Sequence, residues 1–100
     1  MINKSEFPML EKLIAGYLNM DAVEMTGCNE LKGMVEYYTT RVSKKSLYKL
    51  LSEIDMFVNL ANNLDEEFEL RFDFGFNIEY YAGDTAKLFK VIKEIVLKKF

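Results

Sequence analysis

The sequence predicts an all-α protein, a single compact bundle of about five helices, from three observations. Half of the 100 residues are hydrophobic and 29% are charged, a composition typical of a chain with one modest core. The hydrophobic residues recur at spacings of three and four over most of the chain, which is the period of a helix. Proline occurs only once, so little interrupts these patterns. We expect residues 1–100 to form one domain, because the length leaves no room for a second.

The first helix is predicted from about Glu6 to Asn19. Pro8 falls in its first turn, where proline is tolerated because an amide at that position would have no partner within the helix. Ser5 and Phe7 are both candidates for the cap before it. The inward stripe has the helical spacing and consists of Leu10, Leu13, Ile14, Tyr17 and Leu18. This stripe should face the core.

Two further helices are predicted in the middle of the chain. The second begins after the turn-like residues 26–29, with Asn29 as its candidate cap, and the third begins after Ser43 or Ser46 and ends near Asn62. The inward residues of the second are Leu31, Met34, Val35, Tyr38 and Val42. Those of the third are Leu47, Leu50, Leu51, Ile54, Phe57, Val58 and Ala61. The outward face of the third should carry Lys45, Lys49, Ser52 and Glu53.

Two patterns compete in the next segment. Apolar and polar side chains alternate over residues 68–80, which is typical of a strand. The acidic residues 65–67 suit the positive end of a helix, with Asp65 as its cap, and a lone strand would lack a partner. We therefore predict a short helix over residues 66–74 and an extended arm to residue 81, while part of residues 66–81 stays open to a strand.

The last helix is predicted to begin after Gly83, with Asp84 as its cap. Its inward residues are Leu88, Val91, Ile92, Ile95 and Val96, and its outward residues include Lys87, Lys90 and Lys93. Lys98 and Lys99 suit the negative end of a helix. The pattern is therefore that of an amphipathic surface helix with a basic outer face.

Charge is distributed unevenly although the net charge is only −3. Residues 53–84 hold nine acids and one base, whereas residues 85–100 hold five lysines and one glutamate. On a helix, Glu66, Glu69 and Asp73 would lie on one face and form a carboxylate ridge. Such a ridge is either an ordinary solvated face or a docking surface for a basic partner, because opposite charges steer association.

The adjacent tyrosines at positions 80 and 81 admit two interpretations. One ring of the pair can be buried while its neighbour is exposed. Tyrosine is enriched at protein interfaces because it joins a large apolar ring to a polar tip. A half-buried core ring explains the pair equally well, so both interpretations stay open.

The sequence lacks the residue types that most enzymes and metal sites use. Cys28 is the only cysteine, so an internal disulfide cannot form. The sequence has no histidine, so it offers no histidine base to activate the Cys28 thiol. One cysteine without histidine also cannot supply the usual ligand set of a zinc site. Two carboxylate pairs, Asp21 with Glu24 and Glu53 with Asp55, are suggestive. Neither spacing brings two carboxylates to one substrate. We therefore predict that the protein is not an enzyme and has no metal or other cofactor, and only carboxylate-only magnesium or calcium sites stay open from the residue types.

Composition also narrows the location and the class of partner. No segment approaches the roughly 20 continuous apolar residues of a membrane span. The amino end lacks the basic region and hydrophobic run of a secretory signal, so we expect a cytoplasmic protein with no membrane contact. Direct nucleic-acid binding is not expected, because the net charge is negative and no DNA- or RNA-binding pattern is present.

Two segments near the amino end match a short pattern of a known family. They are Phe7-Pro8-Met9-Leu10 through Ala15-Gly16-Tyr17-Leu18-Asn19-Met20-Asp21, and Cys28-Asn29-Glu30-Leu31 at a helix start. They resemble the opening of small immunity proteins of contact-dependent growth inhibition, although Leu18 and Asn19 replace a usual phenylalanine and histidine. The resemblance continues through the leucine-rich helix, the acidic residues 65–67, Gly75 and the last amphipathic helix, and so covers nearly the whole chain.

The resemblance implies a protein that binds the toxic C-terminal domain of an effector delivered by neighbouring bacteria and neutralises it in the cytoplasm. Many such toxins are nucleases, so the implied partner is a basic domain whose phosphate-binding cleft an acidic inhibitor can fill. The candidate toxin-binding residues are Asp21, Asp65, Glu66, Glu67, Glu69, Asp73, Glu79, Tyr80 and Tyr81. Asp21 is included for the family motif alone and is equally a candidate cap. The alternative function is a non-enzymatic helical adaptor or regulatory protein-binding module.

Overall fold

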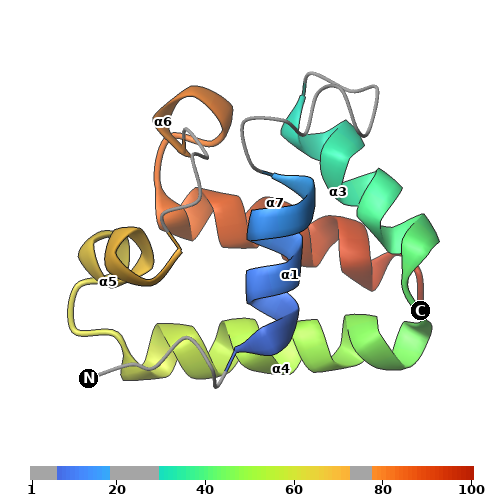
Figure 1. Cartoon of the computed structure of the whole chain (residues 1–100), viewed down its shortest axis with the longest axis horizontal. Coiled ribbons are helices and arrows are strands. Elements are labelled where there is room, and N and C mark those ends of the chain that lie inside the picture. Colours follow the sequence, from blue (N-terminus) through green and yellow to red (C-terminus); the bar gives the residue numbers. More distant parts are fainter. Residues whose placement is uncertain (1–6, 19–29, 73–77) are drawn as a thin grey trace.

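The computed structural model describes residues 7–18, 30–72 and 78–100, except for the side chains of Tyr80 and Tyr81. These parts contain six helices and no strand (Figure 1). The helices are α1 (Pro8–Tyr17), α3 (Leu31–Arg41), α4 (Lys44–Leu60), α5 (Leu64–Arg71), α6 (Ile78–Tyr81) and α7 (Thr85–Leu97). The predicted all-α class is therefore confirmed. None of the described helices is both long and apolar enough to cross a membrane.

Helix α7 is the central element of the arrangement. It contacts α3, α4, α5 and α6, and Figure 1 shows it running above α4 while α1 stands upright in front of both. Helix α1 packs against α4 and α3. Helices α5 and α6 lie together at one end of the molecule, and the start of α4 lies at the other end beside the C-terminus (Figure 1).

The core joins the inward stripes that the sequence predicts. Most of their members are buried, and Tyr17, Val42, Leu51, Ala61 and Val91 are partly buried at its edge. Phe57 lies at the centre of an aromatic cluster, with ring centroids 5.3 Å from Phe7, 5.5 Å from Phe72 and 5.9 Å from Phe89. Most of these rings meet edge to face or tilted, which their quadrupoles favour. This cluster fixes α5 and α7 against α4.

Two of the predicted caps are confirmed. The Ser43 side chain accepts a hydrogen bond from the Ser46 amide at the start of α4, and Asp84 Oδ1 accepts one of 2.8 Å from the Lys87 amide at the start of α7. Each satisfies an amide that has no partner within its helix. The predicted Asn29 cap lies outside the described residues, and α3 is preceded by Glu30, whose side chain makes no capping bond.

The predicted start of the helix over residues 66–74 is wrong by two residues. Helix α5 begins at Leu64, and its cap is Asn63, whose Oδ1 accepts a hydrogen bond of 3.1 Å from the Glu66 amide. Asparagine carries the same short acceptor as aspartate, so the cap falls on whichever of the two has the extended backbone, here Asn63. Asp65 lies inside the first turn instead.

The predicted extended arm is also wrong where the structure describes it, because Ile78–Tyr81 form one helical turn. The amides of Ala82 and Gly83 both donate to the Ile78 carbonyl oxygen, each at 2.9 Å. Gly83 has φ +100°, a conformation that residues with a Cβ rarely adopt. The glycine therefore ends α6 and lets Asp84 begin α7 directly afterwards.

Glu53 is buried, contrary to the prediction that it faces solvent. Its side chain is only 4% exposed, and its Oε1 accepts hydrogen bonds from the amides of Met9 at 2.9 Å and Leu10 at 3.1 Å. The residue before α1, Phe7, has no acceptor in its side chain. A carboxylate on α4 thus caps α1, and this bond positions α1 across α4.

Candidate protein-binding surface

The acidic face of α5 is held outward by the packing of its inner face. Phe68 is buried against Phe57 and Phe89, with centroid distances of 6.5 Å and 5.8 Å. This contact turns Glu66 and Glu69 into solvent, where the spacing of three places them on neighbouring turns of one face. Among the described residues, neither glutamate takes part in an ion pair. We call Glu66 and Glu69 the α5 acidic face.

Asp65 is exposed, but its carboxylate is already engaged within the protein. Its Oδ1 accepts a hydrogen bond of 2.8 Å from the Thr85 amide at the start of α7. Hydrogen bonds from the side chain and backbone of Thr85 lower the pKa of Asp65, because they favour the charged form. Asp65 therefore joins the first turn of α5 to the first turn of α7.

Glu67 is half-buried and differs from its acidic neighbours. Its Oε2 is buried and makes no hydrogen bond within the described part of the chain. A buried carboxylate oxygen without a partner is costly, so its charge is less available to another protein than that of an exposed group. Of the four predicted acids on α5, Glu66 and Glu69 are the two that are exposed and are not engaged by Thr85.

The remaining predicted residues fall into two groups. Glu79 is exposed on α6, which packs against α7 at the same end of the molecule as α5 (Figure 1). The backbones of Tyr80 and Tyr81 also belong to α6, but their side chains lie outside what the structure describes. Asp21 and Asp73 lie outside the described residues. The structure thus brings the α5 acids and Glu79 to one end.

The exposed lysines lie on other elements. Lys44, Lys45 and Lys49 are exposed on the first half of α4, and Lys87 and Lys90 are exposed on α7. Lys93 donates a hydrogen bond of 2.6 Å to Asp55, an ion pair that links α7 to α4. Lys44 and Lys45 therefore lie at the end opposite to α5 (Figure 1), whereas Lys87, in the first turn of α7 that Asp65 contacts, lies at the same end as the α5 acids.

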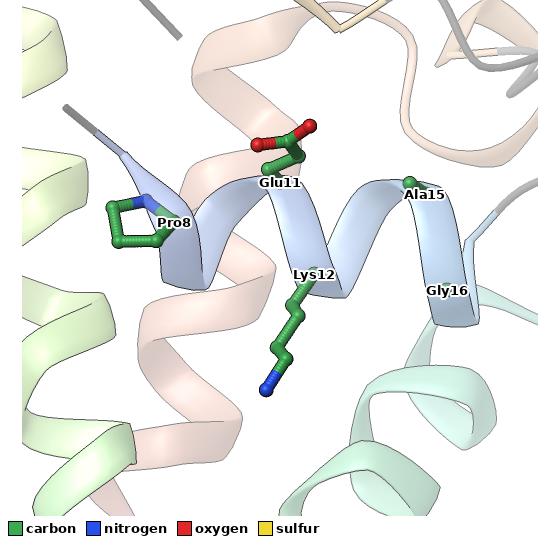
Figure 2. Close-up of a pocket in the computed structure, with 5 residues that line it drawn as sticks. All are labelled: Pro8, Glu11, Lys12, Ala15 and Gly16. Carbon is green, nitrogen blue, oxygen red and sulfur yellow. The ribbon is translucent and has the colours of Figure 1, made fainter. Parts of the chain in front are cut away.

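A shallow hollow lies over the outer face of α1. It measures ≈ 500 Å³ and is lined by Pro8, Glu11, Lys12, Ala15 and Gly16. Figure 2 shows the side chains of Glu11 and Lys12 pointing to opposite sides of the helix, so these charged groups do not converge. Elsewhere in the described parts, no three residues of the types His, Cys, Asp and Glu are grouped so that they could hold a metal ion.

Glu53 is the residue whose role sequence reasoning missed. Burial raises the pKa of its carboxyl, although the amides of Leu10 and Met9 pull in the opposite direction. Burial, together with the charge of Glu53, raises the pKa of Tyr38 to about 12. Asp55, the other member of this candidate catalytic pair, is exposed and paired with Lys93. The two carboxylates therefore serve separate structural contacts.

Comparison with known proteins gives one finding. A family model described as the CdiI immunity protein matches residues 6–95. Of the described helices, the matched segment contains α1, α3, α4, α5 and α6 in full and all but the last two residues of α7. Neither the curated proteins nor the solved structures give a match to the chain.

Proposed function

Because the chain belongs to the CdiI family of immunity proteins, we propose that it protects its cell by binding the toxin domain of a contact-dependent growth inhibition effector. It blocks that domain stoichiometrically in the cytoplasm and performs no chemistry of its own. The observation that supports the binding mode is the α5 acidic face, which is exposed and makes no ion pair among the described residues. Family membership favours this function over a general helical adaptor.

The proposed partner is a nuclease with a basic cleft. A nuclease must attract phosphate, and it therefore carries a positive field at its active site. Glu66 and Glu69 display two carboxylates one turn apart, and Glu79 adds a third at the same end of the molecule. Such a surface fits a cleft built for successive phosphates. Inhibition then follows because substrate and immunity protein compete for one site.

Speed of association is part of the proposed function. A toxin that acts catalytically does damage until it is captured, so protection depends on the rate of encounter as well as on affinity. Opposite charges on the two proteins raise that rate above the value for neutral surfaces, by 10- to 1,000-fold in steered complexes, as an order of magnitude. The neighbouring Leu70, 63% exposed on α5, offers an apolar contact once the two surfaces meet.

The direct test uses the toxin domain encoded beside the gene for this chain. That domain is purified, and its nuclease activity is titrated with the full chain. We expect activity to fall linearly and to vanish near one equivalent, and cells that express the chain should survive the toxin. The Glu66→Lys/Glu69→Lys variant should need a clear excess, whereas Glu36→Lys, an exposed charge reversal on α3, should behave like the wild type. Unimpaired toxin activity in the presence of excess wild-type chain would refute the proposal.

A further inference from the structure

Six exposed cations gather at the end of the molecule opposite to the α5 acidic face. They come from the end of α3, the first two turns of α4 and the segment after α7, which lie together in Figure 1. None of them takes part in an ion pair within the described part of the chain. We call this surface the basic end, and its cations are Arg41, Lys44, Lys45, Lys49, Lys98 and Lys99.

Few acids offset the charge of the basic end. Residues 37–52, which supply four of the cations, contain no acid. The next two acids along α4 are engaged, because Glu53 is buried and Asp55 is paired with Lys93. On α7, Glu94 lies one turn before Lys98 and offsets one cation there. The basic end therefore keeps a net positive charge.

The most exposed aromatic residues lie at the same end. Tyr48 is 67% exposed and Phe100 is 57% exposed, whereas the other described aromatic side chains are buried or partly buried. Tyr48 follows Lys44 and Lys45 by one turn of α4, so two ammonium groups flank its ring. Phe100 directly follows the two lysines after α7. Exposed rings beside cations thus occur twice at the basic end.

The stability of α4 does not explain where its lysines lie. Lys44 and Lys45 are in the first turn, which contains no acid. The amino end of a helix carries a partial positive charge, so cations there are unfavourable. Residues that break such a local rule are expected at functional sites. Together with the exposed rings, these lysines indicate an anionic partner.

The net charge of −3 does not prevent such a contact, although it led to the expectation from sequence that nucleic acid would not bind. The molecule measures 34 Å along its longest axis, and the α5 acidic face lies at the far end (Figure 1). Salt screens exposed charges over about 8 Å at physiological ionic strength. A ligand at the basic end therefore experiences mainly the local cations.

We propose that the basic end binds single-stranded nucleic acid, with its cations on phosphate groups and the rings of Tyr48 and Phe100 stacked on unpaired bases. Proteins that bind single strands without sequence preference combine these two features. Phosphates account for the cations, and bases account for the exposed rings. This function is additional to toxin binding, because the α5 acidic face lies at the opposite end and stays free.

The test measures binding of a fluorescein-labelled 12-nucleotide single-stranded RNA to the full chain by fluorescence anisotropy. We expect a dissociation constant on the order of 10 µM at 50 mM salt, within the usual range of nonspecific binding. With four phosphate contacts, the logarithm of the affinity should fall against the logarithm of the salt concentration with a slope of about −3. A duplex of the same sequence is measured in parallel.

A charge-reversal variant tests the cations. Lys44→Glu/Lys45→Glu should weaken RNA binding by about tenfold or more and flatten the salt dependence. Its unfolding midpoint should rise, because glutamates suit the first turn of α4, so weaker binding cannot be ascribed to unfolding. Glu66→Lys/Glu69→Lys leaves the basic end intact and should bind the RNA at least as tightly as the wild type.

A ring deletion tests the stacking. Tyr48→Ala should weaken binding of the single strand by about tenfold and leave binding of the duplex unchanged, because paired bases cannot stack on the ring. Met56→Ala is the matched control, since Met56 is an exposed apolar residue farther along the same helix, and it should bind both probes normally.

Three results would each overturn the proposal. The first is that the wild type does not bind the RNA at 50 mM salt. The second is that Tyr48→Ala binds the single strand as tightly as the wild type, because charge alone would then hold it. The third is binding to vesicles that contain phosphatidylglycerol but not to RNA, which would assign the basic end to a membrane surface. None of these results bears on toxin inhibition, which is measured separately.

Discussion

At the scale of single residues, Glu53 shows how a charged side chain can become part of the core. Its Oε1 accepts two amides of α1, while its Oε2 and the hydroxyl of Tyr38 are buried without hydrogen-bond partners among the described residues. The positive end of a helix favours a carboxylate, whereas burial disfavours its charge. Burial dominates, since the pKa of Glu53 is raised.

The raised pKa has a definite consequence for stability. Between the ordinary value of 4.5 and the folded value, the folded protein binds more protons than the unfolded chain, so the contribution of Glu53 to stability falls as pH rises. Glu53→Gln keeps an oxygen acceptor for Met9 and Leu10 but does not titrate. We expect the unfolding free energy of the wild type, relative to this variant, to decrease from pH 4 to pH 7 in urea titrations. Parallel pH profiles would contradict the assignment.

The same scale shows why two sequence predictions failed. Charged residues are usually exposed, and the amides that Glu53 caps lie more than 40 residues away in the chain, so no local pattern reveals the contact. Val58 continues the apolar seam of α4 but is 45% exposed. The apolar face of α4 is wider than the area that the other helices pack against. Sequence periodicity identifies the face but does not show where that packing ends.

At the scale of elements, predictability depended on length. Helices α1, α3, α4 and α7 are 10 to 17 residues long, and their stripes repeat over several turns. Helix α5 has only 8 residues. Its buried neighbours Phe68 and Phe72 are four apart, a spacing that satisfies both the period of a strand and that of a helix. The acidic residues at its start correctly indicated a helix instead of a strand. The cap of α5 and the helical turn of α6 could not be predicted, because they depend on backbone geometry that composition does not determine.

Asp65 connects two elements, and its removal tests that role. Asp65→Ala deletes the acceptor for the Thr85 amide, so we expect a loss of about 1 kcal/mol in unfolding free energy, as for a lost helix cap. Glu66→Ala, one residue later on the same turn and exposed, should cost less than about 0.5 kcal/mol. Denaturant unfolding at neutral pH measures both. Equal losses would show that the bond to Thr85 does not link α5 to α7.

The Asp65 variant should also separate stability from binding. Its carboxylate is engaged with Thr85, whereas Glu66 and Glu69 are displayed to solvent. Toxin binding should therefore respond more to Glu66 and Glu69 than to Asp65. The candidate site was thus predictable as an acidic segment, but the sequence did not show which of its carboxylates the fold itself uses.

At the scale of the whole molecule, exposed acids gather at one end and two lysines of α4 lie at the other, although Lys87 at the start of α7 lies near α5. The acids of α5 and α6 lie at one end, and the first turns of α4, which carry Lys44 and Lys45, lie at the other end beside the C-terminus (Figure 1). A net charge of −3 conceals this separation. A partner with a positive cleft is attracted to one end and repelled by the other, so the field orients the encounter before contact.

This orientation makes the rate of toxin capture depend on salt. Fields between exposed charges are screened over about 10 Å at 0.1 M ionic strength and over about 3 Å at 1 M. We expect the association rate of the wild type with the toxin domain to fall steeply over this range in stopped-flow measurements. The Glu66→Lys/Glu69→Lys variant should associate about tenfold more slowly at low salt and show a flatter dependence. The Glu30→Lys/Glu36→Lys variant makes the same change of net charge away from α5 and should retain most of the wild-type slope. If both variants shift the slope equally, net charge rather than the α5 acidic face governs the encounter.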